Sequence, residues 1–136
     1  MTKYLFFGLL LLFLASCSDG IVSECETIQP NVIMRSNFTS IQSELFDKNC
    51  ATSGCHVGEF ASAGLDLSKG NSYKNIVGVK SSGDLMYIEQ GNSSRSYLYQ
   101  KVSSDDVFSV MPPSGKLSQP FIDSLKVWID SGALNN

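Results

Sequence analysis

The sequence predicts a small, mainly α-helical domain. Apolar stripes at helical spacing near both ends of the predicted domain, with shorter helical patterns between them, carry this prediction. In the strongest stripe, near the C-terminus, apolar side chains recur at i, i+1, i+4, i+7 and i+8: Phe121, Ile122, Leu125, Trp128 and Ile129. This spacing puts all five on one face of a helix, the face expected to meet a core. The chain length of 136 residues suits one such domain.

The ends of this last helix are marked in the sequence. Ser118 is a suitable N-cap residue, and Pro120 is tolerated in the first turn because the N–H it lacks has no helical partner there. Gly132 favours a stop at the C-terminal end.

A second helix is expected over residues 40–49. Thr39 and Gln42 fit a capping box, in which the two side chains satisfy backbone N–H groups at the start of a helix. Ile41 and Leu45 then lie four residues apart on one face, with Phe46 beside them. This helix would deliver Cys50 at its C-terminal end.

The middle of the domain predicts short elements joined by loops. Residues 57–70 read as a loop, Tyr73, Ile76 and Val77 suggest a short helix, and another is expected near 94–102. Between them, "LMYIEQGNSS" suggests a brief extended piece that ends at Gly91.

The N-terminus predicts a signal peptide over residues 1–16. An apolar run too short to span a membrane follows Lys3, and Leu14-Ala15-Ser16-Cys17 resembles the bacterial lipobox. Cys17 would then be the lipidated first residue of the mature chain; the alternative is an ordinary signal peptide cut elsewhere. Residues 17–37 read as a tether and residues 38–136 as the domain, so we expect a lipid-anchored protein of the bacterial envelope, periplasmic or associated with the outer membrane.

Composition excludes some functions. Charged residues make up 17% of the chain and the formal net charge is −3, which argues against a nucleic-acid partner. The chain has one histidine, and no Ser/His/Asp or paired-carboxylate spacing stands out, so an enzyme is not expected.

The stretch "NCATSGCHVG", residues 49–58, carries the candidate site. Cys50, Cys55 and His56 resemble the Cys-x-x-Cys-His attachment motif of c-type haem, with a gap two residues wider. Residues five apart on a regular helix lie about 140° apart around its axis, against about 60° for residues three apart. Residues 51–54 would therefore have to loop out, and Gly54 permits the positive φ that such a loop needs.

A second iron ligand is predicted downstream of the histidine. "SVMPPSGKLS" places Met111 before two prolines, which restrict the backbone after the sulfur. His plus Met is the ligand pair of electron-transfer cytochromes. Met86 is the reserve candidate, and Met34, which precedes the cysteines, is less convenient.

The order of these motifs is similar to that of a class I cytochrome c domain. "CATSGCH", "AGLDLS", "NSYKNIVGV", "SYLYQKV", "MPPSGKLS" and "LKVWIDSGA" resemble the cytochrome c-like domains of bacterial envelope lipoproteins with a widened haem motif, over about residues 38–134. The resemblance implies N- and C-terminal helices packed together around haem c. It also implies thioether links through Cys50 and Cys55, and iron ligation by His56 and Met111.

Two other interpretations remain open from the residues alone. A Cys50–Cys55 disulfide in a structural or interaction lipoprotein is permissible in the envelope but leaves His56 and Met111 without a role. A zinc site would need Cys25, in the tether, to join Cys50, Cys55 and His56. The favoured hypothesis is a monohaem cytochrome c that carries single electrons between redox partner proteins in the envelope.

Overall fold

The computed structural model describes residues 34–136. The predicted signal peptide, the lipidation site Cys17, Cys25 and residues 17–33 of the tether lie outside the described residues. Within the described part, no helix combines the length and the apolar character needed to cross a membrane.

The first helix begins at an asparagine cap. The side-chain oxygen of Asn37 accepts the N–H of Ser40 at 2.8 Å, and α1 (Phe38–Ser40) continues directly into η1 (Ile41–Cys50). The helix expected over 40–49 is therefore present, but the predicted Thr39 cap is wrong. Asn37 is an equally good capping residue and lies two positions earlier. Thr39 is thus inside the helix, and its hydroxyl donates to the carbonyl of Asn136 at 2.9 Å.

Short elements fill the middle of the chain. They are η2 (Ser62–Gly64), α2 (Ser72–Ile76), η3 (Ser93–Arg95) and α3 (Tyr97–Ser103). The short helices expected near 73–77 and 94–102 correspond to α2 and α3. The extended piece expected before Gly91 forms only isolated bridges, such as Val77 with Ile88, so residues 34–136 contain no sheet.

The last helix, α4 (Gln119–Asp130), has the predicted ends. Ser118 is its N-cap residue, although it contributes its carbonyl, which accepts the N–H of Phe121 at 3.0 Å, and not its side chain. Gly132 has a φ of 102° and its N–H donates to Ile129 at 2.9 Å, which ends the helix.

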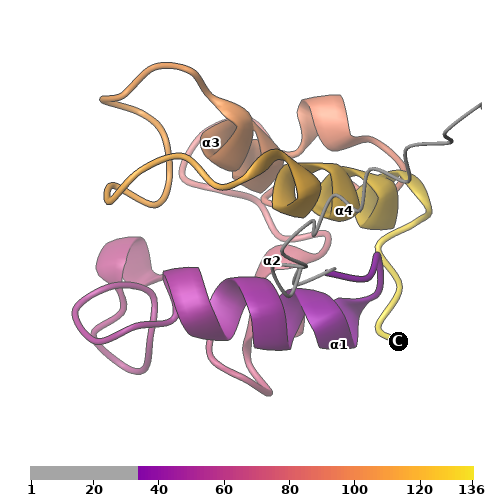
Figure 1. The fold of residues 1–136 in the computed structure, drawn as a ribbon. Helices are drawn as coiled ribbons and strands as arrows, with labels where there is room; N and C mark the ends of the chain where they lie inside the picture. Colours follow the sequence, from indigo (N-terminus) through magenta and orange to yellow (C-terminus); the bar gives the residue numbers. More distant parts are fainter. Residues whose placement is uncertain (1–33) are drawn as a thin grey trace, which may run out of the picture.

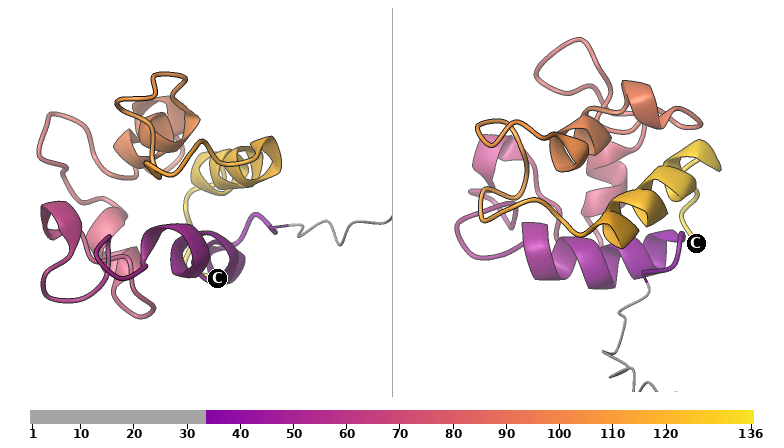
Figure 2. Two further views of the ribbon diagram at one scale, coloured as in Figure 1. Left: turned by 60° about the vertical axis from the view of Figure 1, so that its left-hand side comes forward. Right: turned by 45° about the horizontal axis from the view of Figure 1, so that its top comes forward.

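The predicted apolar face of α4 forms much of the core. Ile122, Leu125, Trp128 and Ile129 are buried and Phe121 is half-buried. Figures 1 and 2 show α4 lying beside both the first helix and α3. The contact with the first helix includes the rings of Phe38 and Trp128, whose centroids are 5.6 Å apart. The predicted fold class, a small mainly helical domain, is confirmed.

The two ends of the described chain lie together. Met34 is buried in the core, where the hydroxyl of Ser124 donates to its carbonyl at 2.8 Å. The C-terminal Asn136 accepts the N–H of Thr39 at 2.8 Å. The loop after η1 and the loop before α4 lie at the opposite end of the molecule (Figure 1).

Candidate functional site

The segment between the two cysteines leaves the helix as a closed loop. Cys50 is the last residue of η1, and the N–H of Cys55 donates to the carbonyl of Thr52 at 2.9 Å. The N–H of His56 returns to the carbonyl of Cys50 at 3.0 Å. Gly54 has a φ of 79°, a conformation that favours glycine. Residues 51–54 therefore loop out as the sequence predicted, which brings the backbone of His56 back to the end of the helix.

Both cysteines of this loop are free thiols and half-buried. Burial, and secondarily the neighbouring Cys55, raises the pKa of Cys50 to about 12. The Cys50 thiol therefore stays protonated at neutral pH, and a protonated thiol is a poor nucleophile in disulfide exchange.

The ring of His56 is oriented by one backbone contact. Its Nδ1 lies 3.2 Å from the carbonyl oxygen of Leu65. Because a carbonyl only accepts hydrogen bonds, this contact favours the tautomer with its proton on Nδ1 and its lone pair on Nε2. A neutral imidazole whose other nitrogen donates to a backbone carbonyl is the usual form of a metal-ligating histidine.

The loop that presents Leu65 is held in place by Asp66. The Oδ1 atom of this carboxylate accepts the N–H of Ser68 at 2.9 Å and that of Gly58 at 3.1 Å, and Oδ2 accepts the amide of Asn71 at 2.7 Å. These hydrogen bonds, those with Ser68 first, lower the pKa of Asp66 to about 2. The contact between His56 and Leu65 thus rests on a loop that an ionised carboxylate stabilises.

A largely apolar pocket adjoins Cys50 and His56. Its walls come from η1, the segment between η1 and α2, the segment between α2 and α3, α3 itself and the loop before α4: Leu45, Phe46, Cys50, His56, Ala63, Leu65, Leu67, Ser82, Tyr87, Tyr97, Leu98, Lys101, Val102 and Met111.

Met111 lines the same pocket as His56. It is 36% exposed, and its backbone N–H donates to the carbonyl of Lys101 at 2.9 Å. The reserve candidates Met86 and Met34 do not line this pocket; Met34 is instead buried in the helical core. Among the described methionines, Met111 is therefore the one placed to bind the same metal or cofactor as His56.

The predicted site residues are largely brought together. Cys50, His56 and Met111 line one pocket, whereas Cys55 does not line it but directly precedes His56. The zinc interpretation gains no support among residues 34–136, where no three metal-ligating side chains of the His, Cys, Asp or Glu type cluster; its fourth ligand, Cys25, lies outside the described residues.

Sequence reasoning missed the polar side of the pocket and the partner of His56. Lys101 extends over the ring of Tyr97, with Nζ 5.5 Å from the ring centroid, and donates to the carbonyl of Ser109 at 3.1 Å. No sequence motif marked Lys101 or Tyr97, since both read as ordinary positions of a short helix. Leu65 acts through its backbone carbonyl, which residue type does not reveal.

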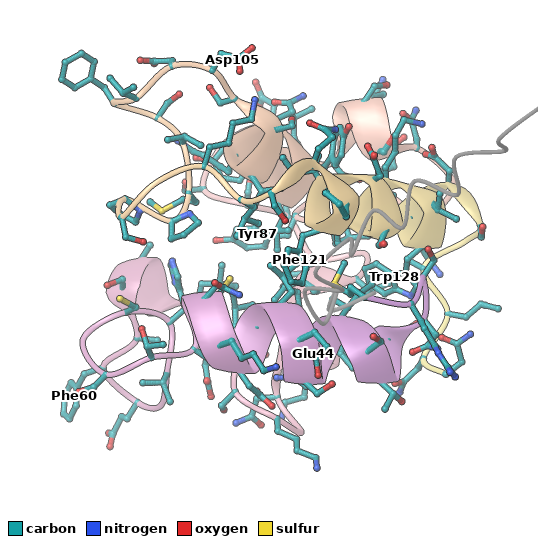
Figure 3. The ribbon with its side chains drawn as sticks, in the orientation of Figure 1. Glu44, Phe60, Tyr87, Asp105, Phe121 and Trp128 are labelled. Carbon is teal, nitrogen blue, oxygen red and sulfur yellow. The ribbon has the colours of Figure 1, made fainter. Side chains whose placement is uncertain are left out.

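The donor set and the pocket fit a c-type haem. The two thiols could form thioethers, and the imidazole of His56 and the thioether sulfur of Met111 border one apolar cavity. Figure 3 shows the side chains of the domain, with Phe60 at the end of the molecule where the first helix leads into the cysteine loop.

The comparisons with known proteins agree with this geometry. Residues 53–115 match the family described as Planctomycete cytochrome C, and the matched segment contains Cys55, His56 and Met111. No curated protein and no solved structure matches the chain. Residues 53–115, which carry both candidate iron ligands, are thus similar to the Planctomycete cytochrome C family.

Proposed function

We propose that this protein is a monohaem cytochrome c that carries single electrons and is anchored by lipid to a bacterial envelope membrane. The observation that carries the proposal is the convergence of Cys50, His56 and Met111 on one apolar pocket. The family match supports it, because cytochromes c are typically electron carriers.

In this proposal each site residue has a distinct task. Cys50 and Cys55 would hold the porphyrin by thioether bonds, and His56, through Nε2, and Met111, through its sulfur, would ligate the iron. The haem, when bound, supplies a one-electron redox couple. Leu65 keeps the proton of His56 on Nδ1, so that Nε2 stays free to ligate.

The pocket walls tune that couple. Leu45, Phe46 and Leu98 are buried and exclude water from one side of the pocket. A low-polarity site disfavours the more highly charged ferric form, and a thioether ligand also favours ferrous iron, so both raise the reduction potential. With His56 and Met111 bound, no coordination position stays open for a substrate, which supports a carrier and not a catalyst.

The anchor belongs to the same proposal. Cys17 follows a lipobox-like sequence, and its acylation would hold the domain at the membrane through a tether that begins outside the described residues. We propose redox proteins of the envelope as its partners.

A redox titration tests the electron-carrier function. The full chain, produced in a bacterium with c-type haem assembly and purified in a nonionic detergent, should be red and titrate as a single one-electron couple. Its reduced absorption spectrum should stay unchanged on addition of carbon monoxide, because Met111 occupies the sixth position. A chain that is folded but colourless would contradict the proposal and favour the structural lipoprotein.

A further inference from the structure

Two exposed aromatic side chains flank the pocket. Phe60 is 93% exposed and lies four residues after His56, and Phe108 is 97% exposed and lies three residues before Met111. Val107, beside Phe108, is also largely exposed. We call these three residues the two-tip surface.

The first tip, the loop that carries Phe60, is held in a defined shape. The carbonyl of Gly58 accepts the N–H of Ala61 at 3.2 Å, and the carbonyl of Cys55 accepts the N–H of Ser62 at 2.9 Å. Phe60 is therefore fixed between two closed turns, and it points away from the ribbon (Figure 3).

The second tip, the turn that carries Val107 and Phe108, is closed by hydrogen bonds to Asp106. The side chain of Asp106 accepts the N–H of Phe108 at 3.1 Å, and its carbonyl accepts the N–H of Val110 at 2.9 Å. The hydroxyl of Ser104 accepts the N–H of Asp106 at 3.0 Å. Because the turn is closed by these bonds, the exposure of Phe108 is a property of the fold and not of a loose loop.

Both tips lie close to residues that line the pocket. Ala63, three residues after Phe60, lines the pocket. Lys101, another lining residue, contacts the chain just after Phe108: its Nζ donates to the carbonyl of Ser109 at 3.1 Å, and its carbonyl accepts the N–H of Met111 at 2.9 Å. Figures 1 and 3 place the two loops at the end of the molecule opposite the described chain ends.

Carboxylates border both tips. Glu59 directly precedes Phe60, and Asp105 and Asp106 directly precede Val107, all three exposed. Lys116 pairs with Asp105, but the formal charge of the chain as a whole is negative, −3. An apolar surface bordered by negative charge is complementary to an apolar surface bordered by lysine or arginine.

We infer that the two-tip surface is a docking site for a redox protein whose cofactor edge is apolar and ringed by basic side chains. The inference rests on the proposed function and specifies the partner's chemistry. Small interfaces with aromatic anchors suit transient electron-transfer complexes. One electron passes between the two proteins, and no bond forms or breaks. A membrane is the less favoured occupant, because the carboxylates are repelled by anionic lipid and the tips lie opposite the end where the chain enters the domain.

Electron-exchange kinetics test this inference. The full chain in nonionic detergent, after its haem spectrum and reduction potential have been recorded, is mixed with a basic mitochondrial-type cytochrome c as the protein probe. Stopped-flow absorbance gives the second-order rate constant for the approach to equilibrium. Hexaammineruthenium(III), a small cation without an apolar surface, is the second probe. Phe60→Ser/Phe108→Ser is the test variant, and Val127→Ser, on an exposed face of α4, is the matched control.

Docking through the tips predicts at least a tenfold loss of rate for the double variant with the protein probe and less than a twofold change with hexaammineruthenium(III). Val127→Ser should stay within twofold with both probes. Glu59→Gln should weaken the dependence of the protein-probe rate on salt concentration. An unchanged protein-probe rate in the double variant, or equal losses with both probes, would overturn the inference.

A vesicle arm separates docking from membrane insertion. With the chain anchored in phosphatidylcholine vesicles, a free docking surface predicts the same tenfold difference between the wild-type chain and the double variant. If the difference disappears on vesicles, the tips are covered by the bilayer and the inference is wrong. A colourless chain would be detected before mixing and would contradict the proposed function itself.

Discussion

At the residue scale, Met111 and the cysteine loop should fail in different ways. Met111→Ala removes a proposed iron ligand but leaves Cys50 and Cys55 intact, so haem attachment should be retained. The open sixth position should lower the reduction potential and allow carbon monoxide to bind the reduced protein. Met86→Ala is the matched control, since Met86 is similarly exposed but does not line the pocket. Carbon monoxide binding by the control, or its absence in Met111→Ala, would show that Met111 is not the ligand.

Asp66 gives the site a defined dependence on pH. Its folded pKa, about 2, lies below the ordinary value of 3.8, so ionised Asp66 stabilises the fold above about pH 4. That contribution is lost as pH falls from 4 towards 2, where the carboxylate is protonated. Unfolding midpoints measured between pH 6 and pH 2 should fall less steeply in Asp66→Asn than in the wild-type protein. The exposed Asp84→Asn serves as control and should keep the wild-type slope; equal slopes for wild type and Asp66→Asn would contradict this role.

The sequence predicted the reactive side chains of the site better than their supports. Cys50, Cys55, His56 and Met111 are chemically distinctive residue types in a recognisable order, so their pattern could be read directly. Leu65 supports His56 through a backbone carbonyl, which any residue could supply once the loop has its shape. Such contacts depend on folded geometry and carry no sequence signal.

At the scale of the element, the central contact is between α4 and the first helix. Trp128 is 1% exposed, stacks near Phe38 and donates from Nε1 to the carbonyl of Leu134 at 2.9 Å. Trp128→Ala should reduce the free energy of unfolding by about 3–5 kcal/mol, the range for a large buried aromatic side chain. Urea unfolding followed by circular dichroism measures the loss.

Val127 is the matched control on the same helix. It is 52% exposed, and surface substitutions usually change stability by less than about 0.5 kcal/mol. If Trp128→Ala and Val127→Ala shift the unfolding midpoint equally, α4 does not pack as described.

The helices also show where sequence patterns are ambiguous. The stripe on α4 fixed its buried face because five apolar positions agree with one helical period. The start of the first helix was less determined, since Asn37 and Thr39 are both good caps. The structure selects Asn37, and the C-terminal Asn136 then bonds to Thr39. That contact joins residues 97 positions apart, so no local pattern could reveal it.

At the scale of the whole molecule, the proposed lipid anchor would set where the protein works. Cys17→Ser removes the proposed acylation site. We therefore expect no processed, membrane-bound form of this variant: the chain should either become soluble or keep its signal peptide. Cys25→Ser is the control and should leave membrane attachment unchanged. Intact-mass analysis of the mature chain checks this; an N-terminus elsewhere, without acyl groups, would contradict it.

The fold class followed from local patterns, whereas the pocket did not. Helical periodicity marked the terminal helices, but the pocket combines η1, α3 and connecting segments that are distant in the sequence. The exposed Phe60 and Phe108 illustrate the same limit, because an aromatic residue in a sequence is expected in a core until the structure shows it outside.

Covalent haem attachment is the most direct test of the account. The full chain, matured in a host competent for c-type haem assembly, is denatured in acid, extracted with organic solvent and analysed by absorbance and intact mass. Thioether bonds survive when iron ligation is lost, so the haem absorbance should stay with the polypeptide, whose mass should equal the chain plus one haem. Cys50→Ala and Cys55→Ala should each leave one link or abolish maturation. A folded, colourless chain with a Cys50–Cys55 disulfide, or haem that passes entirely into the organic phase, would contradict the central claim.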